Sequence, residues 1–140
     1  MLASIWVSGR PRPQGSRNWK VPVRNAALDD FRAKVSHEAA LIWTGAASEG
    51  PVRIGITFYF GRPKKHFGTG KNAEVMRDDA PEAMFKMPDV DKLARSVLDA
   101  LSGIVYKDDQ QVFWLQAHKE WADASHPIGT AIIVESMDGV

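Results

Sequence analysis

The stretch MPDVDKLARSVLDALSGIVYKDDQQV, residues 87–112, says most about the fold. Within it, Asp91–Leu101 reads as an amphipathic helix, because its leucine and valine side chains recur at three- and four-residue steps and form one apolar stripe. The pair Ser102-Gly103 supplies a C-terminal stop. After this stop we expect a short strand at 104–106 and a polar turn at 107–111.

The rest of the chain alternates strand and helix patterns around this helix. The expected elements are a strand at 2–7, a helix at 26–43, a strand at 51–60 that is central in the sheet, and a last strand at 128–134. Residues 61–88 are rich in glycine and proline and read as a long loop. The predicted fold is therefore α+β, a single domain over 1–140 in which two helices pack on a small mixed β-sheet in the order β-α-β-α-β-β.

Composition sets limits on the class of protein. The chain has 140 residues, 44% of them hydrophobic and 25% charged, as expected of one globular domain. It contains no cysteine, which excludes a disulfide framework, a thiolate zinc site and a cysteine nucleophile. The longest apolar stretches are too short to cross a bilayer and no signal peptide is visible, so we expect no membrane association and a cytoplasmic location.

The net charge of +1 is the sum of a basic first part and an acidic second part of the chain. Through Arg77 there are 13 Lys and Arg against 5 Asp and Glu, a balance of +8, and from Asp78 onward there are 5 against 12, a balance of −7. This asymmetry is consistent with a surface that binds a polyanion beside a carboxylate cluster that holds cations. Two solvated faces that neutralise each other are the alternative.

A basic segment follows the first strand. Residues 9–24, GRPRPQGSRNWKVPVR, contain five basic residues and no acidic one, and their prolines and glycines exclude a helix. Trp19 lies in this segment, where it could stack on a nucleic-acid base. The other tryptophans, which we expect in the core, are Trp6, Trp43, Trp114 and Trp121.

Carboxylates are the sharpest chemical feature of the chain. Asp89 and Asp91 open the predicted helix of residues 91–101, and Asp108 and Asp109 follow in the polar turn. Mg²⁺ takes oxygen ligands and needs only one or two carboxylates beside phosphate and water. The alternatives are an ordinary helix N-cap for Asp89 and an ordinary turn for the Asp-Asp pair.

One basic side chain lies close to these acids along the helix. Arg95 falls between Asp91 and Asp99 at four-residue spacing, which predicts either a solvated ion-pair row or an arginine that faces a phosphate. The four histidines are scattered and form no metal-binding pattern, and the chain has no G-x-S-x-G elbow, P-loop or G-x-G-x-x-G motif.

The stretch 87–112 resembles the signature of the RusA-type Holliday-junction resolvases. That signature is a Pro-Asp-x-Asp at a helix start, a Leu-Asp-Ala-Leu inside the helix, a glycine, an aromatic residue and then Asp-Asp-x-Gln. The run GRPRPQGS at 9–16 also looks like the family's basic, proline-rich opening after the first strand. The resemblance implies a Mg²⁺-dependent endonuclease of bacterial or phage origin that acts in DNA recombination and repair. Such an enzyme works as a homodimer and nicks two opposed strands of a four-way DNA junction.

By this resemblance the catalytic metal ligands are Asp89, Asp91 and Asp109, with Mn²⁺ as an expected substitute for Mg²⁺ and no small-molecule cofactor. The chain departs from the family pattern at two positions. Arg95 replaces a usual lysine and keeps the charge, so we expect it to act in catalysis, but a guanidinium cannot deprotonate. Lys92 replaces a frequent asparagine. The residues expected to support the ligands are Asp99, Asp108 and Lys92.

DNA recognition in such an enzyme relies on shape and on phosphate contacts. The residues expected to contact the DNA backbone are Arg10, Arg12, Arg17, Lys20, Arg62, Lys64, Lys65 and Lys71. The dimer surface is expected at Val112–Leu115 or at the first strand. Two other functions stay open from the sequence: a nuclease of other branched or flapped DNA, and a non-catalytic junction-binding module that kept the fold.

Overall fold

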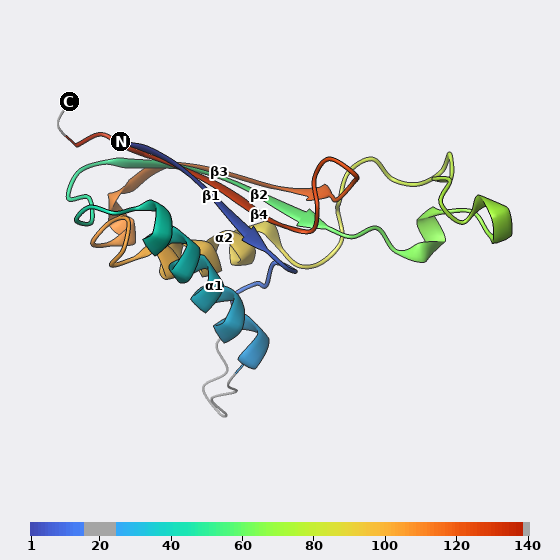
Figure 1. Ribbon diagram of the computed structural model, residues 1–140, viewed down its shortest axis with the longest axis horizontal. Helices are drawn as coiled ribbons and strands as arrows, with labels where there is room; N and C mark the ends of the chain where they lie inside the picture. The colour runs from blue at the N-terminus through green and yellow to red at the C-terminus, as the bar shows by residue number, and fades with distance from the viewer. Residues whose placement is uncertain (16–24, 139–140) are drawn as a thin grey trace.

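The computed structural model of the chain describes residues 1–15 and 25–138 (Figure 1). Its main elements are β1 (Leu2–Ser8), α1 (Ala26–Ile42), β2 (Val52–Phe60), α2 (Val90–Leu101), β3 (Val112–Trp121) and β4 (Gly129–Ser136). Three single-turn 3₁₀ helices are η1 (Lys64–His66), η2 (Gly70–Asn72) and η3 (Asp109–Gln111). The predicted order β-α-β-α-β-β is confirmed.

The strands form one mixed sheet in the order β1-β4-β2-β3. β4 pairs antiparallel with β1 and with β2, whereas β3 pairs parallel with β2, so that Ile54 lies between Val134 on one side and Leu115 on the other. The central position predicted for residues 51–60 is confirmed, because β2 has a neighbour on each side. β1 and β3 are the two edge strands.

Both helices cover the same face of the sheet, and the core lies between these two layers (Figure 1). The apolar stripe predicted on α2 is confirmed, since Leu93, Val97 and Leu101 are fully buried and Leu98 is nearly so. Burying each such side chain contributes about 1.5–3 kcal/mol to folding. The same burial fixes the polar face of α2 toward solvent, and this face carries the acidic residues of the helix.

The short strand expected at Ile104–Tyr106 is wrong. The backbone instead reverses at Gly103, whose φ of +85° is a conformation that glycine adopts readily, and the amides of Ile104 and Val105 donate back to the carbonyl of Leu101. Tyr106 makes only isolated bridges and packs onto α2, where its hydroxyl donates to Leu98 O at 2.6 Å. The strand after α2 is β3, which continues well beyond the apolar residues 112–115.

The expected core position of the tryptophans is half wrong. Trp43 is buried and Trp121 is half-buried, but Trp6 and Trp114 are exposed on the face of the sheet that no helix covers. In β1 the side chains alternate, so that Ile5 and Val7 enter the core and Trp6 points away from it. Trp19 lies outside the described residues.

Residues 61–88 form the long loop that the glycines and prolines predict. The loop leaves the end of β2, extends away from the sheet and returns to α2 (Figure 1). Two backbone bonds close its outer part, from Gly68 N to Val75 O and from Arg77 N to His66 O. Among the residues that the structure describes, no helix has the length and apolar character needed to span a membrane.

Candidate active site

Asp89 begins α2, as predicted, but its carboxylate does not cap the helix. The residue has an extended backbone, and its carbonyl accepts the first helical bond from Leu93 N at 3.1 Å, while its side chain accepts no capping hydrogen bond. The carboxylate is more than half exposed, and its Oδ2 lies 3.9 Å from Lys92 Nζ. The interpretation of Asp89 as an ordinary N-cap side chain is therefore wrong, and its oxygens face solvent.

Asp91 lies in the first turn of α2 and is exposed. The positive end of the helix dipole favours acidic side chains at this position. Asp89 and Asp91 thus place two carboxylates at the same end of one helix, as the sequence predicts.

The polar turn after α2 holds the other two acids, and Asp108 has a structural task there. Its Oδ1 accepts from Gln110 N at 3.0 Å, and Gln111 Oε1 accepts from Asp108 N at 2.9 Å, which together form a reciprocal capping box at the start of η3. Asp108 is therefore the acid of the pair that shapes the turn.

Gln111 is a positioning residue: it ends the Asp-Asp-x-Gln pattern of the sequence, but no role was predicted for it. Its Nε2 donates to Ser48 O at 2.8 Å and to Gly50 O at 2.9 Å, and its Oε1 also accepts from Lys107 N at 3.0 Å. One side chain thus ties the turn to the segment before β2. The signal for it was present, because an Asp followed three residues later by Gln is a capping-box pattern.

Asp109 lies next to α2, where its Oδ2 accepts from Arg95 Nη1 at 2.9 Å. Arg95 is about half exposed and Asp109 is one-third exposed. Of the salt bridges among the described residues, this is the one that involves Arg95. The ion-pair row expected of Arg95 with Asp91 and Asp99 therefore does not form. Arg95 instead connects the acidic helix to the turn.

Tyr106 lies near this pair, and the pKa of its phenol is raised. Burial raises the pKa of the Tyr106 hydroxyl, and the nearby Asp109 and Asp99 carboxylates raise it further, against a smaller opposing effect of Arg95. The phenol therefore keeps its proton at neutral pH and donates it to Leu98 O. Through this bond the turn is fixed on α2, and the half-buried Asp99 contributes negative charge nearby.

The donor atoms at this end of the molecule suit a hard divalent cation in kind, because Asp89, Asp91 and Asp109 offer carboxylate oxygens. Within residues 1–15 and 25–138, however, no three acidic, histidine or cysteine side chains are gathered closely enough to hold a metal ion. Asp109 is engaged with Arg95. The three carboxylates therefore match the cation in chemistry and are not assembled around a common point.

Lys119 supports the segment that leads into Asp89, and sequence reasoning did not identify it. From β3, its Nζ donates to Pro88 O at 2.8 Å and also to Lys86 O. These bonds attach the end of the long loop to the sheet immediately before α2 begins. A lysine on a strand 31 residues further on leaves no local signal in the sequence.

The described part of the basic segment runs beside α2. Ser96 Oγ donates to Arg12 O at 2.8 Å, and Gln14 N donates to Lys92 O at 3.0 Å. Arg10 is exposed and Arg12 is half-buried. The hydrogen bonds of Arg12 and Gln14 place the segment that carries both arginines beside α2. Arg17 and Lys20 lie outside the described residues.

The basic residues of the long loop have two different environments. Arg62 faces inward at the base of the loop, where it lies over the Trp121 ring at 5.1 Å from its centroid and donates to Pro81 O at 2.8 Å. Lys64, Lys65 and Lys71 are exposed. The three lysines have the exposure that a phosphate contact requires, whereas Arg62 stabilises the base of the loop.

Two helices on one face of a mixed sheet, with carboxylates at the start of one helix and basic segments beside it, define a small α+β domain with a candidate hydrolytic site. The family model described as Endodeoxyribonuclease RusA matches residues 5–135. The chain therefore belongs to the RusA endodeoxyribonuclease family, a family of hydrolases that act on phosphodiester bonds in DNA, and the resemblance seen in the sequence is confirmed.

A curated relative is similar over most of its length. The chain is 32% identical over 126 residues to the uncharacterized protein YqaN of Bacillus subtilis (strain 168), and the match covers 84% of this chain and 86% of YqaN.

Proposed function

We propose that this protein is a Mg²⁺-dependent endonuclease that resolves four-way DNA junctions by paired nicks. The observation that carries the proposal is the placement of Asp89 and Asp91 at the solvent-facing start of α2, with Asp109 brought to the same helix by Arg95. Family membership supports the nuclease chemistry. We place its action in the cytoplasm of a bacterial cell, in recombination and repair of DNA.

In this proposal Asp89, Asp91 and Asp109 would gather around the cation, with Asp109 exchanging its salt bridge to Arg95 for the metal. When bound, Mg²⁺ would supply a water of lowered pKa and neutralise charge on the scissile phosphate, and Mn²⁺ would replace it. Asp108 is not a ligand in this scheme, because its carboxylate is already used by the capping box. Gln111 and Tyr106 keep the turn that carries Asp109 against α2.

Arg95 has two tasks in the proposed reaction. Without DNA it neutralises Asp109, at 2.9 Å. With DNA bound, its guanidinium is one helical turn from Asp91 and can hold the charge that develops on the phosphate oxygens. A planar guanidinium suits phosphate, since it donates two parallel hydrogen bonds.

The DNA backbone is bound, in this proposal, by the basic segment at Arg10 and Arg12 and by the exposed lysines of the long loop. Both lie beside or lead into α2, so they flank the proposed cleavage site. Contacts of this kind recognise the shape of a junction and carry no base sequence.

Two nicks on one junction require two active sites, and we propose a homodimer formed through the β3 edge. Phe113, Trp114 and Leu115 are consecutive, exposed and apolar, and they lie on an edge strand. The Arg53 guanidinium lies over the rings of Phe113 and Trp114, at 5.6 and 5.8 Å. The alternative surface, β1, exposes Leu2 and Trp6 as separate side chains.

The substrate is tested by cleavage of a synthetic four-way junction, a flap, a Y-form and a plain duplex, each with Mg²⁺ and with EDTA. We expect paired nicks in the junction only with Mg²⁺, and little cutting of the duplex. Preferential cutting of the flap or the Y-form would replace the junction by other branched DNA as the substrate. Binding of the junction without cleavage of any of these DNAs in Mg²⁺ or Mn²⁺ would favour a non-catalytic binding module.

A further inference from the structure

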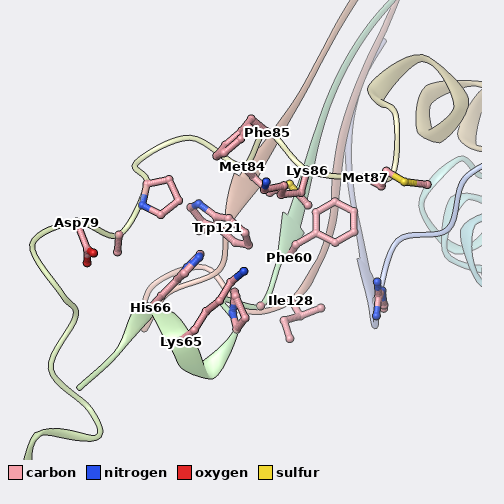
Figure 2. A pocket seen from close by; sticks show the side chains of 15 residues that line it. Phe60, Lys65, His66, Asp79, Met84, Phe85, Lys86, Met87, Trp121 and Ile128 are labelled. Atoms are coloured by element: carbon pink, nitrogen blue, oxygen red, sulfur yellow. The ribbon is translucent and has the colours of Figure 1, made fainter. Parts of the chain in front are cut away.

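A pocket of about 850 Å³ lies at the base of the long loop, beside the segment that leads into α2 (Figure 2). Phe60 and Trp121, the last residues of β2 and β3, form its floor, and His66 and Phe85 from the loop lie around it. Met87 also lines the pocket, two residues before Asp89. The chain therefore passes directly from the pocket lining to the proposed cleavage site.

Four of the residues that line the pocket carry aromatic rings: Phe60, His66, Phe85 and Trp121. His66 meets Trp121 edge to face, with ring centroids 5.1 Å apart, and Phe85 stays 65% exposed at the mouth. Burial lowers the pKa of His66, and the charges of Arg62 and Lys65 lower it further, so its ring is neutral at pH 7. The pocket thus presents uncharged ring surfaces to a ligand.

The rim of the pocket is positive. Arg10, Lys65 and Lys86 line it, and the Lys86 ammonium lies 4.6 Å from the Phe85 ring centroid. The acidic lining residue, Asp79, has its carboxylate 3.0 Å from Arg77 Nε. The pocket therefore combines ring surfaces with cations, which matches a flat aromatic ligand that carries negative charge.

One polar atom of the pocket lining is unsatisfied. The buried indole N–H of Trp121 has no hydrogen-bond partner among the described residues. Leaving a buried donor unpaired is unfavourable. Because this donor is itself inaccessible, it is a local cost in the packing of Trp121 and is not counted as a contact for the ligand.

We propose that this pocket binds one unpaired nucleotide of the DNA, with its base against Phe85 and Trp121 and its phosphate near Lys65 and Lys86. The inference rests on the proposed function, because a branch point is where a junction offers a base that is free to unstack. A volume of about 850 Å³ lies within the usual range of roughly 300–1,000 Å³ for small-ligand pockets and is suited to one nucleotide. Aromatic side chains bind unpaired bases without sequence preference, since every base has a stacking face.

The test uses the full chain in EDTA, so that cleavage does not interfere. The probes carry the fluorescent base 2-aminopurine at one position: at the branch point of a four-way junction, within an arm of the same junction, and in a short single strand. Wild-type protein should change the fluorescence at the branch point and in the single strand, and leave the arm position unchanged.

Phe85→Ala should abolish this fluorescence change and weaken single-strand binding by about 5- to 150-fold, the range for loss of one stacked base. Phe85→Trp should restore both. The matched control is Leu41→Ala, because Leu41 is an apolar side chain of α1 with similar exposure that lies outside both the pocket and the proposed dimer surface. Lys86→Gln should weaken single-strand binding, with a smaller effect at high salt.

A signal change that Phe85→Ala leaves intact, or single-strand binding that Phe85→Ala and Leu41→Ala weaken equally, would overturn the pocket assignment. So would an absence of any signal change with the wild type. These readouts are independent of cleavage. A protein that cuts junctions and fails this test keeps its proposed function and loses the inference, whereas one that passes it and cuts no DNA keeps the pocket and loses the proposed function.

Discussion

Arg95 Nη1 lies 2.9 Å from Asp109 Oδ2, and this contact joins α2 to a turn 14 residues further along the chain. It brings a carboxylate from the turn to the polar face of the helix that begins at Asp89. The same guanidinium is thus placed beside a proposed metal ligand and one turn from another, Asp91.

Replacement of Arg95 separates a role in catalysis from one in stability. We expect Arg95→Ala to lower the single-turnover cleavage rate by about 10²-fold or more, because a donor that stabilises developing charge is lost. Arg95→Lys should keep much of the activity. The melting temperature of Arg95→Ala should hardly change, since exposed ion pairs contribute only about 0–1 kcal/mol.

The control for that experiment is Arg77→Ala, which removes another exposed Arg–Asp pair, with Asp79 at 3.0 Å, outside the proposed site. An unchanged cleavage rate in Arg95→Ala would show that Arg95 has only a structural role. A rate increase in Arg95→Lys would indicate that a lysine able to transfer a proton is needed at this position.

Gln111 is expected to fix the turn that carries Asp109. Gln111→Leu removes hydrogen bonds to Ser48 O and Gly50 O and leaves two turn amides without their acceptor. We expect a loss of about 1–3 kcal/mol in the free energy of unfolding, measured in urea, and a larger proportional loss of cleavage rate in the protein that remains folded. Gln110→Leu, an exposed glutamine of the same turn whose backbone amide is kept, should change neither, and equal stability of the two variants would contradict the role of Gln111.

The basic segment is expected to supply affinity. Neutralising Arg10, Arg12 and Arg17 together to alanine should weaken junction binding in EDTA and flatten the log–log salt dependence by roughly one unit per lost phosphate contact. The corresponding arginine-to-lysine variant keeps the charge and should keep the slope. Unchanged binding of the alanine variant at several salt concentrations would identify the segment as a solvated loop.

The β3 edge is expected to form the dimer. Trp114→Lys replaces the middle one of three exposed apolar residues by a charge and should shift the protein toward monomer in sedimentation equilibrium, because charges on an edge strand oppose pairing. Leu41→Lys, on the exposed face of α1, is the control and should leave the mass unchanged. A Trp114→Lys variant that sediments like the wild-type dimer would exclude this edge.

The elements that could be predicted from the sequence are those with a strong local pattern. The apolar stripe of α2 and the β-branched and aromatic run of β2 are local, and both elements form where the pattern places them. The strand predicted at 104–106 does not form. Three consecutive β-branched or aromatic residues occur both in strands and in buried turns, so their pattern does not distinguish the two. Here the reversal at Gly103 and the Tyr106 bond to Leu98 decide the outcome.

The residues of the candidate site also fall into those whose position follows from a local sequence pattern and those whose contacts depend on tertiary packing. Asp89 and Asp91 are close in sequence, so their shared position at a helix start follows from local pattern. The contact of Arg95 with Asp109 and the support from Lys119 depend on how β3 and the turn pack against α2. Periodicity contains no such information, and the four-residue spacing of Arg95 from Asp91 and Asp99 favoured the wrong partners.

The matched pair Asp109→Asn and Asp108→Asn tests the central claim most directly, by single-turnover cleavage of a four-way junction in saturating Mg²⁺. Asp109→Asn should abolish cleavage while junction binding in EDTA persists or tightens, because a neutral amide is a poorer ligand for Mg²⁺ and repels phosphate less. Asp89→Asn and Asp91→Asn should behave in the same way. Asp108→Asn should retain most of the cleavage, since its role is to shape the turn. Near wild-type cutting by Asp109→Asn, with Asp108→Asn inactive, would contradict the assignment of Asp109 to the hydrolytic centre.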